Sequence, residues 1–354
     1  MLLNQKEVIL GLENRVISLQ IGGAIERPTP LSLAKANSYK YESQQPQQVS
    51  NTQTPGQQTQ NQPGLKQLPT CRFEGKVMDL ALLGSEYLVV AEGNIDPASK
   101  QVIKIFKGDK LVKEITEPRF RAGFYPYQAI CPFNAFGRVF EVAGDRIMFN
   151  SHDWKIYSIK MTGANIAVHQ ELDPKCRLNH FRVVSNPLCL FGITTDRIIK
   201  ASIDNNNPQV TKCAEMDKAL TAIEYGGGYL FVAQHCSMHM FQGDNALIIL
   251  DSHLKERNKF HVDMRESIRH LKYFSCKGIH YLMVSSFGYD SMLLVYEFTP
   301  SDLWLNFCRK ITGANQNPMC SWVNHALPLA NSGSVLTVGP LGHCVVHRFR
   351  LDFN

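Results

Sequence analysis

The chain has 354 residues, of which 44% are hydrophobic and only 19% are charged, with a formal net charge of +6 at pH 7. This apolar fraction is ample for a large core, whereas the charge is mild and is not gathered into the basic stripe that electrostatic nucleic-acid binders carry. Direct contact with nucleic acid is not excluded but is not expected, and no apolar run approaches the ~18 residues of a membrane-spanning helix.

The ten cysteines are scattered along the chain, and none of them forms a Cys-x-x-Cys pair. The sequence also has no Asn-x-Ser/Thr sequon, and the opening residues reach Lys6 and Glu7 too early for a secretory signal. We therefore expect reduced thiols and a cytoplasmic or nuclear location.

The first predicted element is a hairpin over residues 8–21 that turns at Glu13 and Asn14. It begins almost at Met1, so we expect it to lack earlier strands of its own. The interpretation is that it forms half of a shared sheet, which the last C-terminal residues complete.

Residues 22–69 differ in character from the rest of the chain. Within them, the stretch from Gln44 to Gln62 contains one aliphatic residue, Val49, and no aromatic residue. Such a segment cannot bury enough surface to offset its ordering entropy, which predicts a disordered Gln/Pro-rich insertion loop. A Gln-rich docking segment is the alternative.

Beyond residue 70, pairs of short apolar runs with a period near two recur, and turn formers separate them. The most regular pair spans residues 145–160, where Ile147 and Phe149 alternate with their neighbours and Trp154, Ile156 and Ile159 resume the apolar pattern. Hairpin turns are predicted near residues 14, 96, 152, 196, 239, 288 and 341. The only helical candidate is a short turn around residues 303–310.

There are seven hairpins, six of them with an earlier strand upstream, and beyond the insertion their turns recur at intervals of roughly 50 residues, which is typical of a β-propeller. A single small sheet cannot bury both of its faces, but packing sheets around an axis buries them and leaves only short edges. The prediction is an all-β, seven-bladed β-propeller over residues 1–354, a single domain closed by the N- and C-terminal strands.

The best functional lead is the segment 117–136, which is rich in aromatic residues, Pro and Arg and has no clean period. Its side chains are of the types that supply binding energy at protein interfaces. The candidate protein-binding residues are Arg119, Phe120, Arg121, Phe124, Tyr125 and Tyr127. The alternative is that several of them fill gaps between sheets or line the channel.

Other candidate sites are weaker. His235 and His239 could bind a metal, but on a hairpin turn a spacing of four does not bring side chains together, and ordinary turn residues are the preferred interpretation. The glycines of 225–229 lie between two strands, whereas phosphate cradles precede a helix. No catalytic motif is present, so we expect no enzyme activity, cofactor or metal.

The architecture resembles the WD-repeat class of propellers in outline, although Asp153-Trp154 reverses the Trp-Asp signature and Gly342-His343 falls inside the last hairpin. Residues 70–250 also resemble the C-terminal propeller of the family that includes the large subunits of the damaged-DNA-binding complex and of the cleavage-and-polyadenylation factor. The strand pair 87–106 after a low-complexity insertion and the hairpin 144–159 carry this likeness. The resemblance implies a scaffold in a nuclear or ubiquitin-ligase complex and transfers no site residues.

The sequence therefore predicts a non-enzymatic scaffold for protein–protein interaction, whose partners are other subunits of a multiprotein complex. Two alternatives remain open. One is a propeller-shaped regulatory or exchange factor acting on a small GTPase, and the other is an enzyme with a site at the channel mouth. An enzyme would show polar residues with shifted pKa values converging on the channel, whereas a scaffold would show an exposed aromatic and Arg patch.

Overall fold

The structure is a computed structural model, and every regular element that it describes is a β-strand. The described residues are 2–4, 7–12, 15–20, 76–93, 101–108, 110–120, 139–203, 208–235, 245–264, 267–286, 292–312, 325–329, 333–338 and 344–349. No helix within these ranges is long and apolar enough to cross a membrane.

The described strands form seven antiparallel sheets, each with its strands in chain order. The first sheet contains β1 (Leu2–Asn4), β2 (Glu7–Leu12) and β3 (Arg15–Gln20), and the second β4 (Lys76–Leu83), β5 (Tyr87–Gly93), β6 (Val102–Lys107) and β7 (Lys110–Ile115). The third contains β8 (Phe140–Ala143), β9 (Arg146–Asn150), β10 (Ile156–Thr162) and β11 (Asn165–Leu172), and the fourth β12 (His180–Ser185), β13 (Leu188–Ile193), β14 (Arg197–Ser202) and β15 (Gln209–Glu215). The fifth contains β16 (Ala219–Gly226), β17 (Tyr229–His235), β18 (Asn245–Leu250) and β19 (Glu256–Val262). The sixth contains β20 (Ile268–Cys276), β21 (Ile279–Ser286), β22 (Met292–Thr299) and β23 (Trp304–Thr312), and the last β24 (His325–Leu329), β25 (Ser334–Val338) and β26 (Cys344–Arg348).

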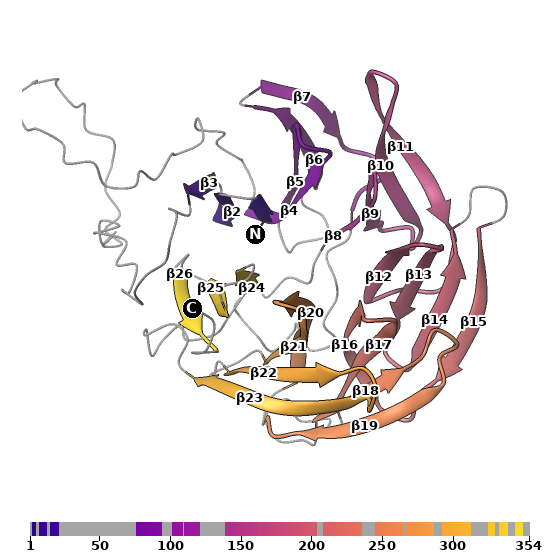
Figure 1. The fold of residues 1–354 in the computed structure, drawn as a ribbon. Helices are drawn as coiled ribbons and strands as arrows, with labels where there is room; N and C mark the ends of the chain where they lie inside the picture. Colours follow the sequence, from indigo (N-terminus) through magenta and orange to yellow (C-terminus); the bar gives the residue numbers. More distant parts are fainter. Residues whose placement is uncertain are drawn as a thin grey trace, which may run out of the picture.

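The sheets are arranged around a centre, as Figure 1 shows. The first strands of consecutive four-stranded sheets, β4, β8, β12, β16 and β20, contact one another around it. The fourth strands, β7, β11, β15, β19 and β23, form the outer rim. This is a β-propeller, which confirms the predicted all-β fold, while the number of blades stays a prediction.

The two faces of the ring follow from the antiparallel order, because successive connections within a meander alternate between the ends of the strands. One face, the turn face, carries the connections after first and third strands, whose described residues are 84–86, 108, 144–145, 163–164, 186–187, 203, 208, 227–228, 251–255, 277–278 and 300–303. The other, the loop face, carries the connections after second and fourth strands, whose described residues are 101, 116–120, 139, 151–155, 173–179, 194–196, 216–218, 263–264 and 267.

The core lies between the sheets, where the second strand of each four-stranded sheet is buried along nearly its whole length. Its largest fully buried side chains include Phe149, Phe191, Phe231 and Phe298. Polar side chains also join neighbouring sheets at buried positions. The Asp79 carboxylate of β4 accepts hydrogen bonds from the backbone N–H groups of Val139 and Phe140 at 2.7 and 2.9 Å, which fixes the second sheet to the third.

Several expectations need correction. Residues 303–310 form no helical turn, because residues 304–312 are strand β23, which pairs with β22 throughout its length. The N-terminal hairpin does not lack strands of its own, since β1 pairs with β2, and β24–β26 form a separate sheet. Residues 350–354, which were expected to complete the N-terminal sheet, lie outside the described residues, as does the predicted insertion loop 22–69.

Candidate functional site

The connection between β9 and β10, residues 151–155, holds Trp154 on the loop face with 51% of its surface exposed. Its backbone has a φ of 67°, in the left-handed region that costs a bulky residue energy. Two hydrogen bonds hold this conformation: Trp154 N–H donates to the Ser151 carbonyl at 3.1 Å, and Ser151 N–H donates to the Lys155 carbonyl at 3.0 Å. The indole is therefore presented to solvent by a fixed turn.

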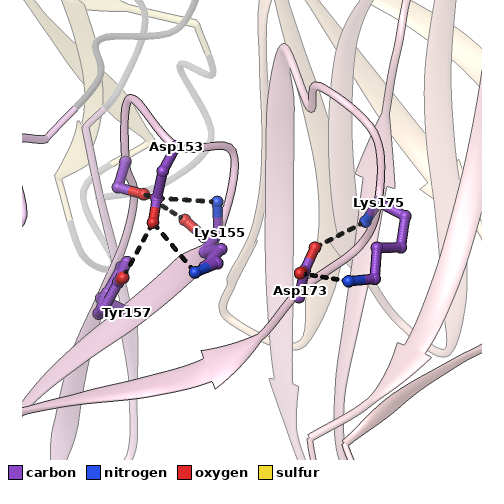
Figure 2. Close-up of polar contacts among 6 residues, drawn as sticks. Asp153, Lys155, Tyr157, Asp173 and Lys175 are labelled. Carbon is purple, nitrogen blue, oxygen red and sulfur yellow. Dashed lines mark hydrogen bonds and ion pairs between the residues drawn. The ribbon is translucent and has the colours of Figure 1, made fainter.

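Asp153 is the centre of this turn (Figure 2). Its carboxylate accepts the Ser151 hydroxyl, the Lys155 N–H at 3.3 Å and the Tyr157 hydroxyl at 3.1 Å, and the Lys155 ammonium lies 3.4 Å away. Burial acts to raise the pKa of Asp153, but the hydrogen bonds from Ser151, Lys155 and Tyr157 outweigh it and lower the pKa below its ordinary value. The turn is thus built around a carboxylate that stays charged at neutral pH.

The predicted binding segment meets this turn at its described end. His152 N–H donates to the Arg119 carbonyl at 3.1 Å, and Phe120 forms an isolated antiparallel bridge with Ser151. The His152 ring donates from Nε2 to Gln101 Oε1 at 3.1 Å. Burial, followed by the nearby Arg119 charge, lowers the pKa of His152, so the imidazole is neutral at pH 7. Loops of the second and third sheets therefore form one surface.

The six candidate residues separate into three groups. Arg119 has a half-exposed side chain, which pairs with Glu117 at 3.2 Å. Phe120 is only 1% exposed and packs in the core with Phe140 and Phe149, so for this residue the packing alternative holds and its ring cannot reach a partner. Arg121, Phe124, Tyr125 and Tyr127 lie outside the described residues, and their role stays a prediction.

A second charged turn flanks the first, as Figure 2 shows. In the β11–β12 connection, Asp173 accepts the backbone N–H of Lys175 at 3.1 Å and its ammonium at 2.6 Å. These hydrogen bonds lower the pKa of Asp173, and the Lys155 charge acts in the same direction, which indicates that the two turns are neighbours. We call Arg119, Trp154, Lys155 and Lys175 the loop-face patch: one exposed indole and three cations on neighbouring loops.

The inner strands contain a buried ion network that the sequence analysis did not anticipate. Arg182 of β12 contacts Glu141 of β8 at 2.8 Å and Glu224 of β16 at 3.3 Å. All three side chains are buried, so the guanidinium joins three consecutive sheets. No spacing in the sequence signals this contact, because Arg182 is 41 positions from Glu141 and 42 positions from Glu224.

Metal binding has no support in the described residues, where no three His, Cys, Asp or Glu side chains come together. His235, one of the two histidines considered as ligands, is buried at the end of β17, and its Nδ1 donates to Asn245 Oδ1 at 3.0 Å. The other, His239, lies outside the described residues. At the inner strands, burial, with Arg182 and Arg269 nearby, lowers the pKa of His180 to about 3, so this ring is neutral and a poor proton donor.

Comparison with solved structures identifies proteins of similar fold. A chain of the mitotic checkpoint complex matches 97% of this chain and 87% of its own length, with a TM-score of 0.61 and 12% identity. The Cps50 (Swd1) β-propeller domain of Myceliophteria thermophila matches 78% and 84%, with a TM-score of 0.55 and 10% identity. BBS1N, solved in complex with ARL6DN, matches 82% of this chain and 84% of its own, with a TM-score of 0.54 and 9% identity.

At such identities the likeness extends to the fold alone. No family model matches the sequence, and no curated protein matches it either. The propeller architecture is thus supported by solved structures, while the resemblance to the damaged-DNA-binding and cleavage-and-polyadenylation subunits stays a prediction.

Proposed function

We propose that the chain is a non-enzymatic β-propeller scaffold that binds another protein subunit through its loop-face patch, with Trp154 as the anchor. The observation that carries this proposal is the 51% exposure of Trp154 on a hydrogen-bonded turn beside Arg119. Trp and Arg are enriched among the residues that dominate interface energies. A turn whose backbone is already fixed before binding loses less conformational entropy when the partner arrives.

The polar clusters of the described residues support a scaffold more than an enzyme. The buried carboxylates of Glu141 and Glu224 contact Arg182, and that of Glu171 contacts Arg146 at 3.2 Å and accepts the Ser158 hydroxyl. Each is engaged by a cation of the protein itself, which is the arrangement of a structural ion pair. A general acid and base would instead face a space that a substrate can enter.

The solved neighbours give independent support of a coarser kind. One belongs to the mitotic checkpoint complex, and BBS1N was solved in complex with ARL6DN, so propellers of this shape occur in multiprotein assemblies. We extend the proposal to the rest of the 117–136 segment, in which Arg121, Phe124, Tyr125 and Tyr127 would enlarge the patch. A cytoplasmic or nuclear complex is the proposed setting.

The test compares three forms of the intact protein in pull-downs quantified by mass spectrometry: wild type, Trp154→Ala and Val112→Ala. Val112 is the control, because it is an apolar residue that is 41% exposed but lies on outer strand β7 rather than on the loop face. At least one protein should be lost with Trp154→Ala and retained with Val112→Ala. Its purified form should bind Trp154→Ala about thirtyfold more weakly, which corresponds to the ~2 kcal/mol of an interface anchor.

The melting temperature separates binding from folding in this experiment. An exposed side chain contributes little to the core, so Trp154→Ala should melt close to wild type. If all proteins recovered with the wild type also bind Trp154→Ala at full strength, the loop-face patch is not the interaction site and the proposal fails.

A further inference from the structure

Outer strand β23 exposes two aromatic rings on the rim of the propeller. Trp304 is 52% exposed and Phe307 is 58% exposed, and among the described strands none pairs with the outer edge of β23. Of the outer strands that the structure describes, β23 is the one that exposes aromatic side chains. The outer strand β15, in contrast, carries mainly polar and charged residues. An apolar edge of this kind is a site where another chain can pair.

The two rings belong to a preformed aromatic surface. Trp304 packs edge to face on Phe260 of neighbouring outer strand β19, with ring centroids 5.2 Å apart, and Phe307 packs edge to face on Tyr296 of β22 at 5.9 Å. Asn258 Nδ2 donates to the Leu303 carbonyl at 3.0 Å and so joins β19 to the start of β23. Figure 1 shows β19 and β23 on the outer rim.

We call Phe260, Tyr296, Trp304 and Phe307 the rim aromatic patch. Burial, helped by the Asp263 charge, raises the pKa of Tyr296 to about 12, so its hydroxyl keeps its proton and remains able to donate a hydrogen bond. The patch therefore offers four rings and a neutral donor, and it lies on strands of two different sheets.

Cations follow the aromatic residues along the same strand. Arg309 and Lys310 are exposed, as is Lys259 on β19, and within the described residues no acidic side chain forms an ion pair with any of them. The acids on the same elements are Asp302, in the turn before β23, Asp263, whose charge reaches Tyr296, Glu297 of β22, which pairs with Asn306 of β23, and Glu256 at the start of β19. The strand thus changes from aromatic to basic along its length, which is complementary to a segment that combines apolar and acidic residues.

We propose that β23 binds an extended acidic segment of a partner protein, which adds a fifth strand to the sheet β20–β23. In such strand addition, the backbone of the edge supplies hydrogen bonds and the side chains supply specificity. Apolar residues of the segment cover Trp304 and Phe307, and acidic residues lie opposite Arg309 and Lys310, where cross-strand pairs of opposite charge are favourable. This surface is on the rim and is separate from the loop-face patch.

The experiment selects peptides from a random library displayed on phage, using the intact protein as bait. Enriched sequences are synthesised with a fluorescent label, and their binding is measured by fluorescence anisotropy. We expect acidic sequences with aromatic or aliphatic residues, whose binding weakens roughly tenfold or more with Phe307→Ala and with the double variant Arg309→Glu/Lys310→Glu. Val112→Ala, an exposed apolar change on outer strand β7, should bind the peptides like wild type.

Backbone methylation distinguishes strand addition from a side-chain contact. N-methyl groups at alternate peptide positions should abolish binding, while those at the intervening positions should be tolerated, because only every second N–H of an added strand faces the sheet. Enrichment of neutral or basic peptides, or full-strength binding to Phe307→Ala, would overturn the proposal. Two further results would also overturn the proposal, because each assigns the surface to another occupant. One is a wild-type dimer, seen by light scattering, that Phe307→Ala dissociates. The other is binding of the wild-type protein to anionic phosphatidylserine vesicles that Phe307→Ala abolishes.

Discussion

Two turns of the molecule have the same backbone hydrogen bonds, but one exposes its apolar residue and the other buries it. In residues 151–155, Trp154 N–H donates to the Ser151 carbonyl, and in residues 251–255, Leu254 N–H donates to the Asp251 carbonyl at 3.0 Å. The φ angles of the two apolar residues are 67° and 59°. Yet Trp154 is 51% exposed, whereas Leu254 is 7% exposed and packs in the core between the fourth and fifth sheets.

The difference shows what each turn does for the protein. Asp251, on the turn face, accepts the N–H groups of His253 and Lys255 at 2.8 and 3.0 Å, much as Asp153 accepts that of Lys155 on the loop face. On the turn face, burial of Leu254 stabilises the strained residue. On the loop face Trp154 is not buried, so the strain of its left-handed backbone is not offset by packing. We propose that the residue is kept there because it recognises a partner.

The largest expected effect comes from truncating the two apolar residues and comparing stability. Leu254→Ala removes a core side chain and should lower the free energy of unfolding by about 2–5 kcal/mol. Trp154→Ala removes a larger side chain from solvent and should change it by less than about 1 kcal/mol. Chemical denaturation of both variants measures the difference, and equal losses would show that Trp154 is a packing residue like Leu254.

An intermediate effect is expected at the two carboxylates that organise the turns. Asp153→Ala and Asp251→Ala should each cost about 1 kcal/mol at pH 7, because each removes charge-assisted hydrogen bonds at a partly exposed site. In both cases burial acts to raise the carboxyl pKa, but hydrogen bonds outweigh it and lower the pKa overall. At Asp153 these hydrogen bonds come from the Ser151 hydroxyl and the Lys155 N–H, and at Asp251 they come from backbone N–H groups. A carboxyl with a lowered pKa stabilises the fold above its unfolded pKa of about 4 and loses that contribution as the pH falls through its folded value.

The sign of this pH dependence makes the carboxylate prediction checkable. The gap in stability between wild type and each Asp variant should be full at pH 7 and should shrink below about pH 4. Denaturation curves between pH 7 and pH 3 measure the gap directly. A gap that stays constant down to pH 3 would mean that the charge of the carboxylate is not what holds the turn.

The hairpins could be predicted from the sequence because their middle strands are short apolar runs between turn formers, as with Ile147, Met148 and Phe149 of β9, all of which are buried. The outer strands could not, since a rim strand faces solvent and lacks such an apolar run: every residue of β15 except Ala214 is exposed. Strand β23 was mistaken for a helical turn for a related reason. Its buried Leu305 and Ile311 are separated by residues that are exposed or half-buried, so the strand lacks the continuous apolar run of a middle strand.

The candidate site was predictable only in part. The segment 117–136 was found from its Arg and aromatic content, but composition could not show that Phe120 is core and that Arg119 lies beside Trp154. Trp154 was interpreted as the start of a buried strand, because an apolar residue before Ile156 continues the pattern. Whether a turn directs its apolar residue inward or outward depends on neighbouring sheets, and those contacts are not encoded in local spacing.

The smallest expected effect is a gain in stability, whereas most substitutions destabilise a protein. It tests the comparison of the 151–155 and 251–255 turns most directly. Asn tolerates the left-handed backbone region better than other non-glycine residues, so Trp154→Asn should relieve strain and raise the free energy of unfolding by a few tenths to about 1 kcal/mol. Leu254→Asn relieves the same strain but places an amide in the core, so it should destabilise the protein by more than about 2 kcal/mol. If Trp154→Asn is more stable than wild type yet loses the partner recovered by the wild-type protein, the indole is retained at position 154 at the expense of stability. A clear loss of stability in Trp154→Asn would instead mean that the indole supports the turn, and the contrast between the two turns would then be one of degree.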